Sequence, residues 1–122
     1  MENKTKGQAE SQISEAIIKF EREYMGRGPA ETKTYIIKDM VFCRLKGVLT
    51  SAEEQLAKSP EGADLIKRTR MQLLEGARVL LEKMISEITA CQVLSLHTDI
   101  STKTGERVIV FTLDKNLEEQ FC

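Results

Sequence analysis

Hydrophobic positions near the start of the chain follow a helical period. Between Gln8 and Met25, apolar residues recur at steps of three and four: Ala9, Ile13, Ile17, Phe20 and Tyr24. This spacing places them on one face of a helix. The sequence Gly26-Arg27-Gly28-Pro29 follows and predicts the helix end, because glycine adopts the left-handed cap conformation and proline cannot continue a helix.

The pattern then changes to that of strands. Thr34–Gly47 is rich in β-branched and aromatic residues, and Lys38-Asp39 is expected to form the turn of a hairpin. Alternation would then place Tyr35, Ile37, Met40 and Phe42 on one face, and Ile36, Val41, Cys43 and Leu45 on the other. Both faces are largely apolar, so we expect helices on one side and a helix or a second subunit on the other. The pattern therefore predicts a homodimer.

Two capping signals predict the next helices. Thr50-Ser51-Ala52-Glu53 matches a capping box and indicates a short helix to about Lys58. Ser59-Pro60 places a cap residue before a proline and predicts one long helix to about Thr89, where Ala90 stands at a position that favours glycine. The second half of this helix carries a wide apolar face: Leu73, Leu74, Ala77, Leu80, Leu81, Met84, Ile85 and Ile88. We expect a central core helix, with Gly76 allowing another backbone to approach closely.

The last third of the chain predicts a second hairpin. About Gln92–Ile100 pairs with Glu106–Leu113 around a loop in which Gly105 supplies a positive φ. Leu94, Leu96 and Ile100 are expected on one face, against Ser95, His97 and Asp99 on the other. Asp114–Phe121 indicates a weak terminal helix. The chain is thus predicted to be a single α+β domain with the order α-β-β-α-α-β-β, a four-stranded, mainly antiparallel sheet, and a flexible stretch at about residues 1–7.

Composition limits the classes of function. The 122 residues fit one domain with its own core, and 18 basic against 19 acidic residues do not favour a nucleic acid or an anionic membrane as partner. Three widely spaced cysteines indicate a reducing compartment rather than a disulfide framework. The sequence shows no signal peptide and no apolar run of roughly 18 residues. A cytoplasmic protein without direct membrane insertion is expected.

The only histidine offers the first candidate chemistry. His97 and Asp99 lie two apart on one strand, so both side chains leave the same face and can ligate a metal or share a proton. No further ligand follows at a metal-site spacing. Cys43 or Cys91 can pair with His97 for nucleophilic catalysis, but apolar surroundings would raise the pKa of either thiol. The sequence therefore predicts no catalytic set, no metal site and no cofactor.

Basic residues offer the second candidate chemistry. The Gly-rich loop after the first helix lacks the G-K-[ST] of a phosphate loop, although Arg27 can hold a carboxylate or phosphate there. The cluster Lys67-Arg68-Arg70 is interpreted as a solvated face in which Asp64 pairs with Arg68. The candidate ligand-binding residues are Arg27, His97, Asp99 and Lys103.

Three linked segments resemble a known family. FEREYMGRGP at the end of the first helix, the hairpin segment TYIIKDMVFCRLKGVLTSAEEQL, and the ending HTDISTKTGERVIVFTL are similar to the MpsC-like family of small bacterial proteins. The resemblance covers about Gln8 to Leu113. It implies association with a Na+-translocating, membrane-potential-generating system, and relatives are linked with membrane-bound inorganic-carbon uptake. No catalytic residues follow from it.

Three functional hypotheses result. The first is a non-enzymatic accessory or regulatory protein that docks on subunits of a membrane cation or bicarbonate transport complex, and is peripheral to the membrane through that partner. The second is a cytosolic sensor of a small molecule or anion that uses Arg27, His97, Asp99 and Lys103. The third is a thiol-dependent or metal-dependent enzyme, which would require a reactive cysteine or bound metal.

Overall fold

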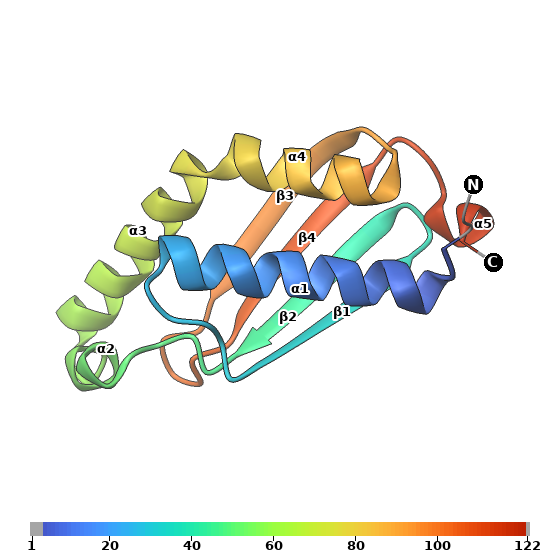
Figure 1. The fold of residues 1–122 in the computed structure, drawn as a ribbon. Coiled ribbons are helices and arrows are strands. Elements are labelled where there is room, and N and C mark those ends of the chain that lie inside the picture. The colour runs from blue at the N-terminus through green and yellow to red at the C-terminus, as the bar shows by residue number, and fades with distance from the viewer. Residues whose placement is uncertain (1–3, 122) are drawn as a thin grey trace.

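A computed structural model describes residues 4–121 as five helices and four strands (Figure 1). In chain order these are α1 (Lys6–Tyr24), β1 (Glu31–Ile37), β2 (Met40–Lys46), α2 (Ser51–Leu56), α3 (Pro60–Gly76), α4 (Arg78–Thr89), β3 (Val93–Ile100), β4 (Arg107–Leu113) and α5 (Leu117–Gln120). The α+β class and the antiparallel four-stranded sheet predicted from the sequence are confirmed.

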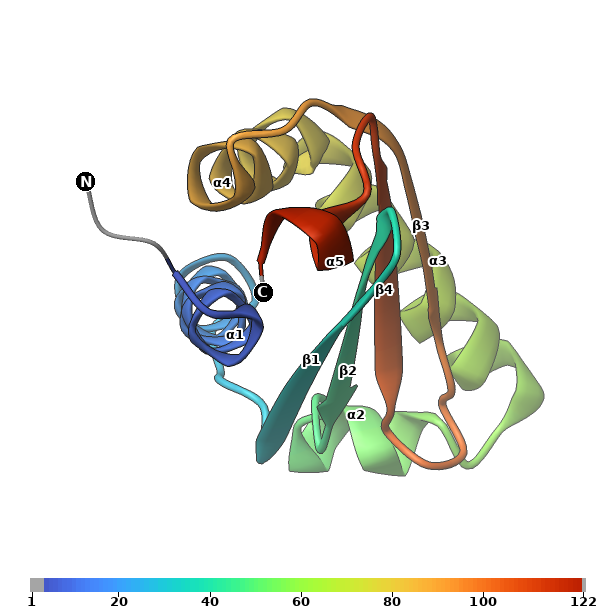
Figure 2. The same ribbon diagram turned by 90° about the vertical axis from the view of Figure 1, so that its right-hand side faces the viewer.

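The two hairpins join through the last strand. The sheet order is β1-β2-β4-β3, so β4 lies between β2 and its own hairpin partner. Lys38 adopts a left-handed φ of 55° in the expected Lys38-Asp39 turn, and Gly105 has a φ of 75° in the second loop. Helices α1 and α4 lie side by side on one face of the sheet, and α5 lies near the end at which β1 and β2 meet (Figure 2).

Helix α1 begins two residues before the predicted start. Thr5 is its N-cap: its hydroxyl accepts the Gln8 N–H at 3.1 Å, and the Gln8 side chain accepts the Thr5 N–H at 2.9 Å. This reciprocal pair satisfies two donors that a helix start leaves without partners. Part of the stretch expected to be flexible is therefore an ordered cap and first turn, and residues 1–3 lie outside the described residues.

The single long helix expected between Ser59 and Thr89 is wrong. The backbone breaks at Ala77, which has φ −107° and ψ 7°, and its N–H donates to Leu74 O in a tightened turn. The break redirects the chain, so that α4 lies on the sheet beside α1 while α3 runs beside the β3 edge (Figure 1). Nothing lies within 4 Å of a Cβ built at Gly76, so the close backbone approach expected there is wrong as well.

The final hairpin also departs from simple alternation. Its register passes from Val93 opposite Leu113 to Ser95 opposite Thr112, which leaves Leu94 unpaired in a β-bulge. Leu94 is 64% exposed. The expectation that Leu94 shares a face with the buried Leu96 and Ile100 is therefore wrong, because the extra residue shifts the alternation by one position.

The two faces of the sheet have different environments. The face toward α1 and α4 holds the core, including Ile36, Val41, Cys43, Ile109 and Phe111, each at most 1% exposed. Among residues 4–121, no helix packs over the middle of the opposite face, which we call the open face. Helices were expected on one face, and a helix or a second subunit on the other. Within the chain, helices cover the first of these faces.

Candidate functional site

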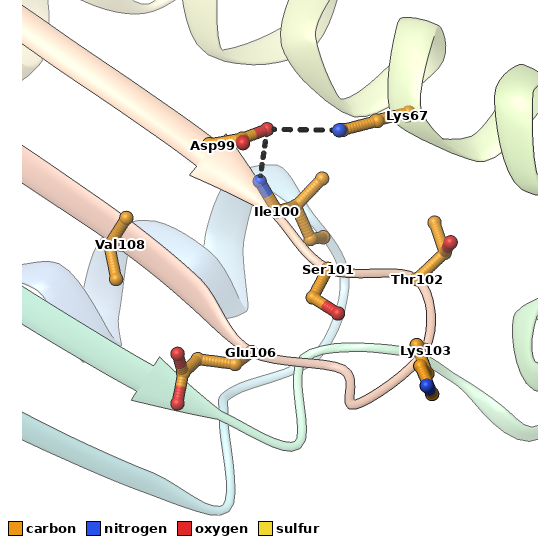
Figure 3. A pocket seen from close by; sticks show the side chains of 8 residues that line it. All are labelled: Lys67, Asp99, Ile100, Ser101, Thr102, Lys103, Glu106 and Val108. Carbon is orange, nitrogen blue, oxygen red and sulfur yellow. Dashed lines mark hydrogen bonds and ion pairs between the residues drawn. The ribbon is translucent and has the colours of Figure 1, made fainter.

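A shallow hollow lies where the β3–β4 loop meets α3, and Figure 3 shows its lining. It has a volume of about 380 Å³ and is lined by Lys67, Asp99, Ile100, Ser101, Thr102, Lys103, Glu106 and Val108. Lys67 Nζ lies 3.3 Å from Asp99 Oδ1, and the same oxygen accepts the Ile100 N–H at 2.8 Å. The Ile100 N–H, followed by Lys67, holds the pKa of the Asp99 carboxyl below its usual range. The hollow thus carries both signs of charge.

His97 lies on β3 next to this hollow without lining it. It leaves the same face of the strand as Asp99, as predicted, but its hydrogen-bond partner is a hydroxyl. Nε2 lies 3.1 Å from Ser95 Oγ, which also bonds to Thr112 Oγ1. His97 is thus hydrogen-bonded to Ser95 rather than to Asp99, so the structure does not show these two residues sharing a proton. Within residues 4–121, no group of three or more His, Cys, Asp or Glu side chains is placed to hold a metal ion.

The four candidate ligand-binding residues do not form one site. Asp99 and Lys103 line the hollow, whereas Arg27 belongs to the loop between α1 and β1 and donates from Nη1 to Leu49 O at 3.1 Å. Since that bond ties two loops together, it gives Arg27 a structural role. His97 lies on the open face of β3, next to the hollow and outside its lining.

The described cysteines are buried. Cys43 faces the helix layer and accepts a hydrogen bond from the Thr34 hydroxyl at 3.7 Å, and burial raises the pKa of its thiol to about 12. Burial likewise raises the pKa of Cys91, whose Sγ donates to Thr89 O. His97 lies on the opposite face of the sheet from Cys43, so these residues do not form a nucleophile and base. Cys122 lies outside the described residues.

A buried charge cluster was missed by the sequence analysis. Arg70, interpreted there as part of a solvated face, is 3% exposed, so that interpretation is wrong. Its Nε and Nη2 donate to the two carboxylate oxygens of Glu53 at 2.9 and 2.7 Å, and Nη2 also donates to Val48 O at 2.9 Å. The planar guanidinium fits this bidentate arrangement and joins α3 to the start of α2.

The second half of the cluster lies deeper. Arg107 opens β4 and is fully buried, with Nη1 3.9 Å from Glu21 Oε2 on α1 and Nη2 donating to Arg70 O at 3.2 Å. Both Glu21 oxygens, and Nε and Nη1 of Arg107, lack a hydrogen-bond partner. Burial raises the pKa of Glu21 and lowers that of Arg107, and each charge partly opposes the shift of the other. The cluster connects α1, α3 and β4 within the interior of the protein.

A weak sequence signal marked this cluster. Arg107 alternates with Ile109 and Phe111, and Glu21 directly follows Phe20 at the border of the apolar stripe of α1. A charged residue at a core position of a strand indicates a buried partner. The spacing alone does not identify that partner, because Glu21 and Arg107 are far apart in sequence.

Most of the exposed large apolar side chains lie in two regions, and Tyr24, Leu56 and Leu94 are exposed elsewhere. On the outer surface of α3 and α4 they are Leu65, Leu73, Val79 and Leu80, with Val79 79% exposed. On the open face Tyr35 and Ile37 are each 46% exposed, and Met40, Phe42, Val108 and Val110 are half-buried. Such patches are typical of surfaces that bind another protein. Within residues 4–121, no helix is both long enough and apolar enough to cross a bilayer.

Comparison with known proteins relates this chain to a family. A family model described as "Na+-translocating membrane potential-generating system (MpsC)" matches residues 5–115. Uncharacterized protein YbcI of Bacillus subtilis (strain 168) is 47% identical over 116 residues, which are 95% of this chain and 94% of that protein. Uncharacterized protein YrhF of the same strain is 27% identical over 111 residues, 89% of this chain and 90% of that protein. No solved structure gives a significant match.

Proposed function

Because the chain belongs to the MpsC family, we propose that it is a non-enzymatic accessory protein that docks on a membrane-potential-generating, cation-transporting assembly. The family description supplies the kind of assembly. The exposed apolar side chains of α3 and α4 carry the docking role, because exposed aliphatic residues on an otherwise charged surface favour association with another protein.

The position of these residues supports this role. Leu65 and Leu73 are eight residues apart on α3, so about two helical turns bring them to the same side. Leu80 and Val79 follow directly after the break, at the start of α4. An amphipathic helix surface of this kind can pack against a helix of a partner.

The chemistry of the candidate site is consistent with a binding role. Asp99 is engaged by Lys67 and the Ile100 amide, and His97 by a serine hydroxyl. The Cys43 thiol, with a pKa of about 12, is not an activated nucleophile at neutral pH. These engagements favour a binding module over a thiol-dependent hydrolase.

The experiment is affinity capture of the tagged full chain from mildly solubilised membranes of its source organism, with mass spectrometry of the captured proteins. We expect subunits of an ion-translocating membrane complex to be recovered with the wild-type chain and lost with the double variant Leu73→Glu/Val79→Glu. Lys19→Glu, which adds the same kind of charge to exposed α1, is the matched control and should retain them. Equal recovery by all three chains would contradict docking through α3 and α4.

A second candidate is a sensor of a small polar molecule at the hollow. The observation that favours it is that two lysines, Lys67 and Lys103, and the carboxylates of Asp99 and Glu106 line one recess. A ligand that binds only the folded state must raise the midpoint of thermal unfolding. Inorganic phosphate, bicarbonate and acidic amino acids are the probes, and the shift should disappear in Lys67→Ala/Lys103→Ala.

A further inference from the structure

Three rows of side chains cross the open face along the hydrogen-bonded register. The first row is Lys33, Arg44, Val108 and Asp99, from the β1 edge to the β3 edge. The middle row is Tyr35, Phe42, Val110 and His97, and the third row is Ile37, Met40, Thr112 and Ser95. In the middle row the residues on β1, β2 and β4 are aromatic or apolar, and all three β3 residues of these rows are polar.

The charges at the two ends of the first row are of opposite sign. Among residues 4–121, Lys33 forms no ion pair, so its ammonium at the β1 edge is available. At the β3 edge, Lys67 and the Ile100 N–H both engage Asp99 Oδ1, and no interaction is assigned to Oδ2. Arg44, between them, is paired with Glu106 at 2.7 Å. The open face therefore carries an unpaired ammonium at its β1 edge and, at its β3 edge, a carboxylate with one oxygen that is not engaged.

We infer that the open face binds a second copy of this chain, with the two-fold axis parallel to the strands. Rotation about such an axis reverses the strand order and keeps each residue in its row. It places β1 of one copy over β3 of the other, so that Lys33 meets Asp99 twice and Tyr35 meets His97 twice. At the centre, Phe42 lies over Val110. Sheets pack face to face in this aligned way about 10 Å apart.

The charges select this axis over the alternative. A two-fold axis across the strands would place each strand over its own counterpart, so that Tyr35 meets Tyr35 and Lys33 meets the apolar Ile37. Neither edge charge would then gain a partner. The parallel axis satisfies both charges and buries the aromatic and Met side chains that are typical of homodimer interfaces. This inference does not rest on the proposed function, which uses α3 and α4.

Charge reversal tests the inference in solution. The mass of the full chain is measured by light scattering after size exclusion, and the dimer dissociation constant by analytical ultracentrifugation. We expect Lys33→Glu to raise the dissociation constant at least about tenfold, because it sets two carboxylates against each other, and Asp99→Lys to do the same. The double variant should restore most of the affinity. Lys19→Glu, on α1, should leave the constant unchanged.

Cross-linking tests the axis. In chains carrying Cys122→Ser, a Tyr35→Cys chain is mixed with a His97→Cys chain and treated with a short bismaleimide. We expect linked pairs of one chain of each kind, and few links between two Tyr35→Cys chains. Predominant Tyr35–Tyr35 links would overturn the parallel axis. A monomeric wild type at every concentration, or a dimer equally stable in all charge variants, would overturn the inference itself.

Discussion

The two faces of the sheet are built from the same strands and differ in what covers them. Phe111 and Val110 are neighbours on β4, yet Phe111 is fully buried under the helices while Val110 stays half-buried on the open face. The covered face contains the charged Arg107, whereas the centre of the open face is apolar. The comparison teaches that the polarity of a strand position does not decide its burial, and that an apolar face without a helix is available to a second molecule.

The largest expected difference between the faces is in stability. Phe111→Ala removes a fully buried ring and should lower the free energy of unfolding by about 3 to 5 kcal/mol, because the helix layer cannot collapse into the space. Val110→Ala on the same strand should cost less than about 1 kcal/mol in the monomer. Urea unfolding followed by circular dichroism measures both. Equal costs would mean that the open face is packed as tightly as the covered one.

The buried charges of the covered face should give the next largest effect. Glu21→Leu leaves Arg107 buried without its counter-charge and should cost about 3 kcal/mol, the lower end for a broken buried pair, because the two groups are 3.9 Å apart. Glu21→Leu/Arg107→Met replaces both charges by apolar groups and should recover much of that loss. A double variant as unstable as the single one would show that Arg107 is held mainly by the Arg70 carbonyl.

Acid should weaken the pair of Glu53 and Arg70, which is the other half of the buried charge cluster. Burial raises the pKa of Glu53, but the bonds from Arg70 and Thr50 outweigh it, so that its pKa lies below the usual value of 4.5. The folded state therefore binds this proton less tightly than the unfolded state. The resulting stability is present above pH 4.5 and is lost as the pH falls through the folded pKa. Unfolding of Glu53→Gln, measured from pH 7 to pH 3, should lack this part of the decline.

The rate of cysteine alkylation should differ between the two faces, and this comparison involves little change in the stability of the protein. Cys43 is fully buried on the covered face and its pKa is about 12, so iodoacetamide at pH 8 should leave it unmodified in the folded protein. A cysteine placed on the open face by Val110→Cys should be alkylated readily in the monomer. Peptide mass spectrometry after native and guanidinium labelling compares the two sites. Native labelling of Cys43 would indicate that the helix layer opens.

Much of the fold followed from local patterns. The apolar stripe of α1, the capping box at Thr50, the Ser59-Pro60 helix start and the turn at Lys38-Asp39 were predicted because each is specified by a few neighbouring residues. The helix that follows Ser59 ends at Gly76, well before the predicted end. Ala90 adopts the left-handed φ of 58° at the end of α4, although the capping rule favours glycine there.

The errors arose where distant segments decide the structure. The break at Ala77 and the bulge at Leu94 depend on packing against the sheet, and the local spacing of residues does not encode that packing. The same holds for the site, since sequence placed Asp99 and Lys103 correctly near one another but joined Arg27 to them without a shared surface. The cluster of Glu21 and Arg107 joins residues from the two ends of the chain and required the fold to be seen.

The central position of β4 has a consequence for how the molecule assembles. Its residues, Arg107–Leu113, form the last of these four strands to leave the ribosome, yet they pair with both β2 and β3. Until then β2 has one unpaired edge and β3 has no partner strand, and such edges invite pairing with other chains. The sheet therefore closes in a late step that brings residues far apart in sequence together, which slows folding. A nascent chain that stalls before Arg107 would be the species most prone to aggregate.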